Sequence, residues 1–137
     1  MRIVPNTHTN HTALVTGANS GLGFEAAAQL AEAVRHSDAW VGFEDPTGTL
    51  VATARAISDR AKRSWVYDVM VDPAWRGRGV GRALVEALLD HPAVRRTQAS
   101  LTTKDAQGVY APQGFREVVS WGDRTTMARP RPVTPRT

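Results

Sequence analysis

Several short segments of the chain are apolar runs or alternate between apolar and polar residues, and Gly, Pro or Asp residues separate them. Alternation with a period of two is typical of a strand with one buried face, because successive side chains point to opposite faces of a sheet. In residues 63–71, this pattern predicts that Trp65, Tyr67, Val69 and Val71 share one face. The same criteria predict strands over residues 12–16, 39–45, 49–57, 63–71, 97–103, 115–121 and 124–128.

Two longer segments carry apolar residues at the spacing of a helix. They predict helices over residues 21–35 and 78–90, and Pro92 stops the second because proline cannot continue the helical hydrogen bonds. Residues 105–114 contain both glycine and proline, so they predict only a short helix or a turn. The apolar stripe of the second helix consists of Val80, Ala83, Leu84, Ala87 and Leu88.

The order of these elements predicts a single α/β domain, with a mixed sheet flanked by helices. Residues 39–45 and 49–57 are separated by a Pro-Thr-Gly turn and are expected to form a hairpin. With 137 residues, the chain is long enough to bury one core. Residues 1–11 are polar and expected to be flexible, and residues 128–137 are rich in proline and arginine and expected to be disordered. The predicted domain therefore covers residues 12–127.

The net charge of the chain is +4, and three of its arginines lie in the last ten residues. The charge of the remainder is too small to indicate a nucleic-acid partner. The chain has no cysteine, which excludes disulfides, thiolate metal ligands and cysteine nucleophiles and fits a reducing cytosol. His8 and His11 have a metal-like spacing without a third ligand, so no metal is predicted. No segment has the length of a membrane span or the apolar core of a signal peptide, and we expect a cytoplasmic protein that does not contact membranes.

A glycine-rich segment, Arg-Gly-Arg-Gly-Val-Gly at residues 76–81, joins the predicted strand 63–71 directly to the predicted helix 78–90. Glycines let backbone N–H groups come close to a ligand, and the N-terminus of a helix favours negative charge. Together with the charges of Arg76, Arg78 and Arg82, this arrangement suits a pyrophosphate group. For the glycines alone, a tight turn with solvated arginines is the more common explanation.

The surroundings of this segment decide between the two explanations, because they resemble the acetyl-CoA loop of the GCN5-related N-acetyltransferases, the GNAT superfamily. A second motif of that family, Tyr-x-x-x-Gly-Phe, also occurs downstream, and the resemblance covers about residues 39–127. The residues that carry it are Arg76, Gly79 and Gly81 in the loop, Val71, Pro73 and Trp75 before it, and Tyr110, Gly114 and Phe115 in the second motif.

The resemblance implies transfer of an acetyl group from acetyl-CoA to a small amine or an exposed amino group. The end of strand 63–71, at Met70 and Val71, would pair its backbone with the pantetheine arm, and a backbone N–H there would polarise the thioester carbonyl. Tyr110 would point at the thioester sulfur and protonate the departing thiolate. The alternative for Tyr110 is a core aromatic whose hydroxyl binds a backbone carbonyl. The pyrophosphate would be held by the amides of Arg78, Gly79, Val80, Gly81 and Arg82.

The attacking amine must be neutral, so the reaction also needs a proton acceptor. Asp68 lies among apolar residues of strand 63–71, an environment that makes a carboxylate a better base, and Asp105 follows strand 97–103. A structural, hydrogen-bonded carboxylate is the alternative for Asp68, and a helix N-cap is the alternative for Asp105. Because the chain has no cysteine, direct transfer in a ternary complex is the simplest mechanism.

A second glycine-rich segment, at residues 16–23, matches the turn Thr-Gly-x-x-x-Gly-x-Gly of the short-chain dehydrogenases without a gap. The resemblance covers residues 12–34, and Glu44 lies where the acidic residue that binds the ribose is expected. The catalytic Tyr-x-x-x-Lys of that family is missing, because neither Tyr67 nor Tyr110 has lysine four positions on. We therefore expect an atypical first strand and helix that join the core and do not bind NAD or NADP.

Three hypotheses follow, in decreasing order of support. The first is an acetyl-CoA-dependent N-acetyltransferase. The second is a non-catalytic acyl-CoA-binding or interaction domain whose acceptor site was lost with the altered N-terminal region. The third is an NAD(P)-binding fragment. The expected partner is an amine substrate, without nucleic acid or membrane, and the chain is expected to be a monomer or a homodimer.

Overall fold

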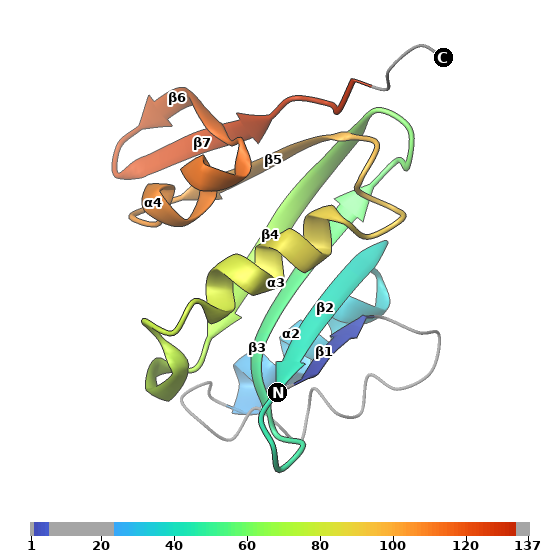
Figure 1. Ribbon diagram of the computed structural model, residues 1–137, viewed down its shortest axis with the longest axis vertical. Helices are drawn as coiled ribbons and strands as arrows, with labels where there is room; N and C mark the ends of the chain where they lie inside the picture. The colour runs from blue at the N-terminus through green and yellow to red at the C-terminus, as the bar shows by residue number, and fades with distance from the viewer. Residues whose placement is uncertain (1, 6–23, 134–137) are drawn as a thin grey trace.

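A seven-stranded sheet runs through the part of the chain that the computed structural model describes, residues 2–5 and 24–133 (Figure 1). Its strand order is β1-β2-β3-β4-β5-β7-β6. The neighbouring strands pair antiparallel except for β4 and β5, which are parallel, so the sheet is mixed, as predicted. The strands are β1 (Arg2–Pro5), β2 (Ala39–Glu44), β3 (Leu50–Ser58), β4 (Arg63–Val71), β5 (Gln98–Thr103), β6 (Arg116–Trp121) and β7 (Arg124–Arg129).

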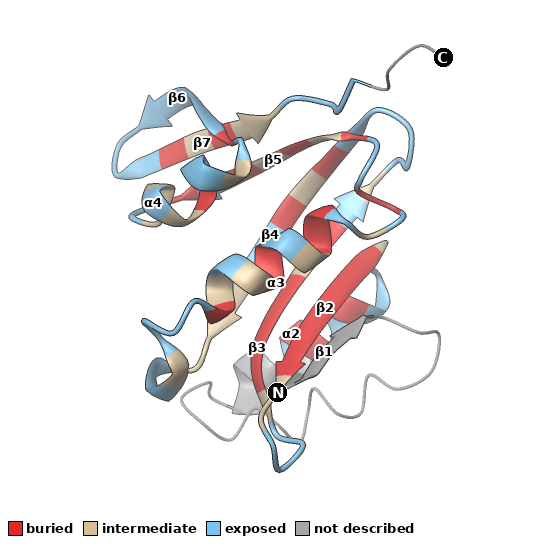
Figure 2. Ribbon diagram, in the orientation of Figure 1, coloured by how far each residue is buried: buried red, intermediate tan, exposed pale blue. Residues whose placement is uncertain are grey.

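Helix α3 (Val80–Leu89) crosses one face of the sheet, over β2, β3 and β4 (Figure 2). Beneath it the strands present small side chains, and Ala39, Ala54 and Ala56 are fully buried there. Small residues on the sheet let the helix pack closely, so its apolar stripe is removed from water. The side chains that α3 buries are Val80, Leu84, Val85, Leu88 and Leu89.

Helix α2 (Phe24–Arg35) lies on the opposite face, behind β2 and β3 in Figure 1. It contributes to a second apolar cluster, in which the indole N–H of Trp40 donates to the hydroxyl of Thr53 at 2.5 Å. Strands β2 and β3 are therefore covered from both sides. The helices among the described residues are all too short or too polar to cross a membrane. The second cluster consists of Leu30, Val34, Trp40, Leu50 and Met70.

Most elements agree with the predictions from sequence. Residues 78–90 contain α3, and residues 105–114 form only the short helix α4 (Gln107–Tyr110) and a 3-10 turn, η3 (Ala111–Gln113). A further 3-10 turn, η2 (Pro73–Trp75), precedes α3. These segments follow the apolar periodicity and the glycine and proline positions that predicted them.

Three expectations about the ends of the domain need correction or stay open. Residues 1–11 are not flexible throughout, because Arg2–Pro5 pairs with β2 as strand β1. The predicted start of the disordered tail, at residue 128, is two residues too early, because β7 extends to Arg129. The predicted strand 12–16 and the glycine-rich segment 16–23 lie outside the described residues.

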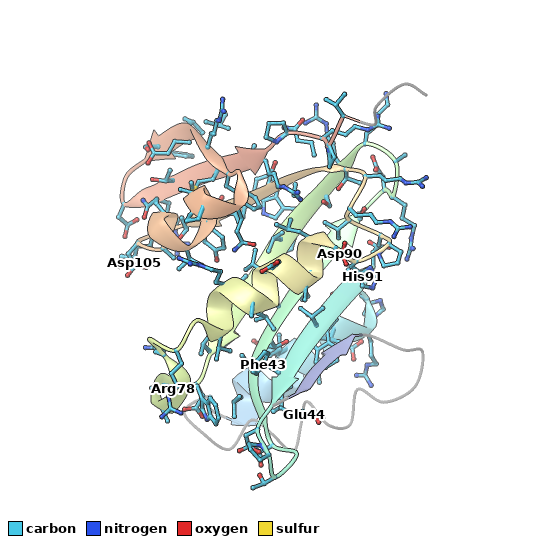
Figure 3. All side chains as sticks on the ribbon, in the orientation of Figure 1. Phe43, Glu44, Arg78, Asp90, His91 and Asp105 are labelled. Atoms are coloured by element: carbon cyan, nitrogen blue, oxygen red, sulfur yellow. The ribbon has the colours of Figure 1, made fainter. Side chains whose placement is uncertain are left out.

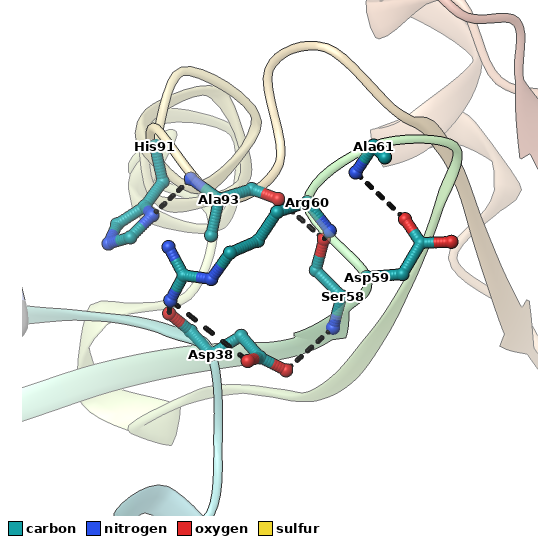
Figure 4. Close-up of polar contacts among 7 residues, drawn as sticks. All are labelled: Asp38, Ser58, Asp59, Arg60, Ala61, His91 and Ala93. Atoms are coloured by element: carbon teal, nitrogen blue, oxygen red, sulfur yellow. Dashed lines mark hydrogen bonds and ion pairs between the residues drawn. The ribbon is translucent and has the colours of Figure 1, made fainter.

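The segment after α3 is tied to the turn between β3 and β4 through Ser58 (Figure 4). The Ser58 hydroxyl donates to the carbonyl oxygen of Ala93 at 2.5 Å, and the Ser58 amide donates to the Asp38 carboxylate at 2.8 Å. In the same turn, the Asp59 carboxylate accepts three backbone N–H groups from residues 61–63, which lower its pKa to about 2. These bonds connect three loops at one end of the sheet.

His91, just after α3, belongs to the same region (Figure 4). Its Nδ1 accepts the backbone N–H of Ala93 at 3.0 Å, which requires that this nitrogen carry no proton. Burial lowers the pKa of His91 below its ordinary value, and the positive charge of Arg60 lowers it further. Protonation of the ring therefore opposes the native arrangement of this loop.

We predict that the free energy of unfolding falls as the pH drops below the ordinary histidine pKa of about 6.5. Because the native pKa of His91 is lowered, the unfolded chain takes up the proton first. The contribution of His91 to the free energy of unfolding is therefore complete above the ordinary histidine pKa. It is lost as the pH falls from that value through the lower native pKa. Urea denaturation over a pH series measures this effect. The variant His91→Asn keeps an acceptor oxygen without titrating and should flatten the profile; an unchanged profile would contradict the assignment.

Candidate functional site

The sheet opens between its two parallel strands. Strands β4 and β5 pair only at Arg63↔Gln98, Ser64↔Ala99 and Trp65↔Ser100. Beyond these pairs, β4 continues to Val71 without a partner on its β5 side, and the two strands diverge (Figure 1). Unpaired backbone groups on a strand are available to a ligand that can complete the hydrogen bonds.

A bulge in β4 lies just after the point where the pairing ends. The register with β3 moves from Arg55↔Tyr67 to Thr53↔Met70, so that Asp68 and Val69 both lie opposite one residue of β3. Asp68 has a φ of 52°, in the left-handed region that aspartate tolerates better than most residues. The extra residue changes which side chains share a face.

The bulge corrects the prediction that four alternating residues of β4 share one face. Trp65 and Tyr67 lie together, with ring centroids 6.3 Å apart. Val69 and Val71 instead pack against the core beneath α3, and Met70 packs into the cluster beneath α2. The strand therefore presents valines to one side of the opening and a methionine to the other.

The surroundings of Asp68 also differ from the predicted apolar environment. The carboxylate is exposed, and its Oδ2 accepts from Nε of Arg55 at 2.6 Å. The Arg55 guanidinium also lies 4.8 Å from the centroid of the Tyr67 ring and donates to the Ser37 hydroxyl at 3.3 Å. Asp68 does not line the cleft described next, so its contacts indicate a role in holding the bulge.

A cleft of about 900 Å³ occupies the opening of the sheet. Its walls come from the end of β4, from the loop before α3 and the first turn of α3, and from α4. Figure 3 labels Arg78 and Asp105, which lie on the two segments that border it. The sequence did not indicate Leu30 and Leu50, which line the cleft from α2 and β3, because only the fold brings these elements together. The predicted site residues that line it are Met70, Val71, Arg76, Gly79, Val80, Gly81, Arg82 and Tyr110.

The start of α3 offers free backbone donors to this cleft. The N-cap Gly79 has a φ of 76°, and a side chain there would meet no atom within 4 Å. The first hydrogen bond into the helix runs from the amide of Ala83 to the carbonyl of Gly79 at 3.1 Å. The amides of Val80, Gly81 and Arg82 therefore have no helical acceptor, and this first turn suits an anion.

The three arginines of the loop have different surroundings. Arg76 donates from Nε to the carbonyl oxygen of Val71 at 3.3 Å and lines the cleft, as does Arg82. The guanidinium of Arg78 lies 4.8 Å from the centroid of the Trp75 ring, and its side chain is not part of the lining. Positive charge therefore reaches the cleft from two of the three arginines, while Arg78 stacks beside the loop.

The end of β4 turns one backbone amide toward the opening. The amide of Asp72 donates to the carbonyl of Val51 on β3 at 2.8 Å. Alternate residues of a strand direct their N–H groups to opposite sides. The N–H of Met70 therefore points toward β3, like that of Asp72, and the N–H of Val71 points into the gap. Of the two residues that the sequence indicated, Val71 therefore offers the backbone donor and Met70 offers a side chain.

Tyr110 enters the cleft from the end of α4. Its side chain is 7% exposed and lies edge-on to Phe115, with ring centroids 5.8 Å apart. Burial raises the pKa of the Tyr110 hydroxyl above its ordinary value, so the hydroxyl keeps its proton. Within the described residues it forms no hydrogen bond, in contrast to the alternative of a core tyrosine bound to a carbonyl.

Two carboxylates line the cleft, and the structure differs from the roles predicted for them from the sequence. Asp105 lines the cleft and does not cap α4, whose N-cap is Ala106 without a side-chain bond. The hydroxyl of Thr103 accepts the amide of Ala106 instead, at 3.0 Å. Asp72, also in the lining, accepts the amide of Ala74 at 2.9 Å. Among the described residues, no three potential metal ligands come together.

Comparison with known proteins agrees with this geometry. The profile of the family described as "Acetyltransferase (GNAT) domain" matches residues 35–117. The chain is 35% identical over 92 residues to "GCN5-related N-acetyltransferase 1, chloroplastic" of Arabidopsis thaliana, a match that covers 64% of this chain and 46% of that protein. The chain thus spans about half the length of this relative.

Solved structures share the whole fold. An aminoglycoside 6′-acetyltransferase type Ii superimposes with a TM-score of 0.77 at 20% identity, covering 98% of this chain and 100% of that one. An aminoglycoside 6′-N-acetyltransferase complexed with coenzyme A gives 0.73 at 18% identity, covering 97% and 100%. At these identities the likeness concerns the arrangement of the elements.

We predict that Asp68 stabilises the β4 bulge through both its left-handed backbone and its bond to Arg55. Asp68→Ala loses both and should lower the free energy of unfolding by about 1–2 kcal/mol. Asp68→Gly also loses the bond to Arg55, but glycine adopts the left-handed backbone without cost. Asp68→Asn tolerates this backbone and keeps a side-chain acceptor for Arg55. Both variants should therefore lower the free energy of unfolding less than Asp68→Ala does. Denaturant titration gives this order. Equal stability of the alanine variant and the wild type would contradict the role.

Proposed function

The chain belongs to the acetyltransferase (GNAT) domain family, and from this premise we propose that it is an acetyl-CoA-dependent N-acetyltransferase acting on a primary amine. One observation carries the proposal: the open edge of β4, the free amides of α3 and the Tyr110 side chain share one cleft. They supply, in that order, partners for an extended arm, an anion site and a proton donor. An acyl thioester of CoA requires all three.

In the proposed complex, the amides of Val80, Gly81 and Arg82 bind the pyrophosphate of the cofactor. Their lack of helical acceptors supports this assignment, as does the open space at Gly79, where a side chain would block the approach. Arg76 and Arg82 add positive charge beside the same amides. Arg78 contributes its backbone rather than its stacked side chain.

The pantetheine arm then runs along the open edge of β4. The N–H of Val71 faces the gap and is the donor that we assign to the arm or to the thioester carbonyl. A donor aimed at that oxygen stabilises the negative charge that develops on it during attack. The valines of β4 and the Met70 side chain line this part of the cleft with apolar surface.

The proposed reaction is a direct transfer. The neutral amine attacks the thioester carbon, an N–C bond forms, and the C–S bond breaks as the thiolate leaves. The Tyr110 hydroxyl, which burial keeps protonated, donates its proton to this thiolate. The amine proton passes through water in the cleft to Asp105, one of two carboxylates in the lining, which we assign as acceptor in place of Asp68. Its return through the same water restores the Tyr110 hydroxyl.

A non-catalytic acyl-CoA-binding domain is the second candidate. It would keep the start of α3 and the edge of β4 and lack a competent acceptor site. Cofactor binding does not separate the two candidates, and turnover does. The chain has no cysteine, so a thiol reagent detects CoA released from acetyl-CoA without background from the protein. Release that depends on an added primary amine supports the enzyme, and binding without release supports the second candidate.

We predict that acetyl-CoA and CoA raise the melting temperature, whereas NAD and NADP do not. A ligand at about one hundred times its Kd stabilises a protein by about 2.7 kcal/mol. Gly79→Glu should abolish the shift, because it adds a carboxylate to the anion site. Gly122→Glu is the matched control, since Gly122 also has a positive φ and open surroundings but lies in the β6–β7 turn. A shift with NAD or NADP alone would overturn the proposal in favour of a dinucleotide-binding protein.

We predict that Tyr110→Phe lowers kcat by about tenfold or more and changes the KM for acetyl-CoA less than about twofold. The pKa of Tyr110 is raised, so the wild type should keep its acid function up to and above pH of about 10, the ordinary tyrosine value. Tyr67→Phe is the control, because Tyr67 is exposed and outside the cleft. Steady-state kinetics over a pH series tests both statements, and equal kcat values for Tyr110→Phe and the wild type would remove Tyr110 from the mechanism.

A further inference from the structure

The free edge of β6 exposes apolar side chains to water. β6 is last in the strand order of the sheet, with β7 on one side and no described element on the other (Figure 1). All six of its residues are exposed, and Trp121, the largest of them, is 89% exposed. Val118 and Val119 are also more than half exposed. An edge strand with these properties is a surface to which another strand can be added.

The opposite edge of the sheet has a different character. β1 has four residues and ends in Pro5, which cannot donate a backbone hydrogen bond. A short edge strand and a proline on it are two of the features by which proteins prevent edge-to-edge association. β6 has six residues and carries neither proline nor lysine. Of the two edges, β6 is therefore the one that is open to a further strand.

The pairing of β6 with β7 determines the face on which its side chains lie, because residues opposite each other in an antiparallel pair share a face. Arg116, Val119 and Trp121 lie opposite three alternate residues of β7 and therefore share one face. Glu117 and Ser120 lie opposite the residues between those three and share the other face. An extra residue between Glu117 and Val119 forms a bulge, so the strand does not alternate strictly.

We propose that two copies of the chain associate through this edge, with their β6 strands antiparallel about a two-fold axis. Such a dimer uses the same surface of both copies, so the surface has to complement itself. When all six residues are paired, Arg116 lies opposite the partner's Trp121, and Glu117 lies opposite the partner's Ser120, each pair from one face. A shift by one residue in either direction would put residues of different faces opposite each other. In the remaining pair of the proposed register, Val118 meets the partner's Val119.

The chemistry of each pair is compatible. The Arg116 guanidinium can stack on the exposed indole of the partner's Trp121. Neither Arg116 nor Glu117 forms an ion pair with another described residue, so both are available to a partner. The hydroxyl of the partner's Ser120 can donate to the Glu117 carboxylate. No two like charges lie opposite each other, and the valines at the axis leave water.

The area of this interface limits its strength. Burial of two indoles removes roughly 300–500 Å² from water, whereas a stable interface buries roughly 1,200–2,000 Å² in total. Four valines and the aliphatic stems of two arginines have to supply the remainder, which leaves the interface at the low end of this range. We therefore expect a reversible dimer with a Kd of roughly micromolar size. No residue of β6 lines the cleft, so the inference does not rest on the proposed function.

Sedimentation velocity over roughly 1–500 µM protein tests the dimer, and the wild type should change from one chain to two within this range. Val119→Lys should raise the Kd about tenfold or more, because it removes apolar surface and brings two like charges together near the axis. Val133→Lys is the matched control. Val133 is also an exposed valine but lies beyond β7, so its variant should dimerise like the wild type. Both positions are exposed, and the melting temperatures of the monomers should be unchanged.

A charge exchange tests the register. Trp121→Lys puts a second cation opposite the partner's Arg116 and should weaken the dimer about tenfold or more. Adding Arg116→Glu to Trp121→Lys puts opposite charges in these positions, so the double variant should dimerise about threefold more tightly than Trp121→Lys alone. A general loss of apolar surface would not be restored in this way.

The outcomes decide the proposal. A wild type that stays monomeric over the whole range would overturn it. A dimer that Val119→Lys weakens no more than Val133→Lys would also overturn it, because the interface would then lie elsewhere. Weakening by Val119→Lys alone supports association through β6. Tighter dimerisation of the double variant than of Trp121→Lys supports the register, and equal or weaker dimerisation contradicts it.

Discussion

The site depends on the early end of one parallel strand pairing. Strands β4 and β5 exchange hydrogen bonds over only three residue pairs, and β4 then continues alone. Backbone donors and acceptors on that edge need partners, because unpaired polar groups away from water are costly. The opening therefore supplies a strand-like surface inside the protein and, between it and β5, the space for a ligand. The loop before α3 and the end of α4 border the same space only because the sheet opens there.

The β4 bulge determines what this opening presents. Without the extra residue, strict alternation would put Val69 and Val71 on the face of Trp65 and Tyr67. With it, the two valines pack beneath α3, and the N–H of Val71 faces the gap. Arg55, on the neighbouring strand, binds the Asp68 carboxylate and covers the Tyr67 ring, so it holds the bulge from outside the cleft.

Local periodicity was sufficient to predict α3 and β4, because each spans enough residues for its period to be visible. It could not predict the surroundings of Asp68, because its partner Arg55 is thirteen positions away on another strand and the bulge interrupts the alternation. The short strand Arg2–Pro5 carries too few residues to display a period, and only its pairing with β2 reveals it. The glycine-rich loop and Tyr110 were predicted from motifs, whereas a hollow beside α3 combines Arg82, Arg95, Arg129 and Gln113 from four segments that no local pattern joins.

The distribution of charge along the cleft and the hollow beside α3 favours one orientation of the proposed cofactor. Arg82 lies at the first turn of α3, where the cleft and this hollow meet, and two further arginines line the hollow. The cleft is also lined by Leu30, Leu50 and Met70 from the cluster beneath α2. A phosphate group is favoured near the arginines and an acyl group near these apolar side chains, because burying a charge against apolar side chains is costly. In the proposed complex, the phosphates of the cofactor therefore lie toward the arginines, and its acyl thioester lies toward the apolar side chains.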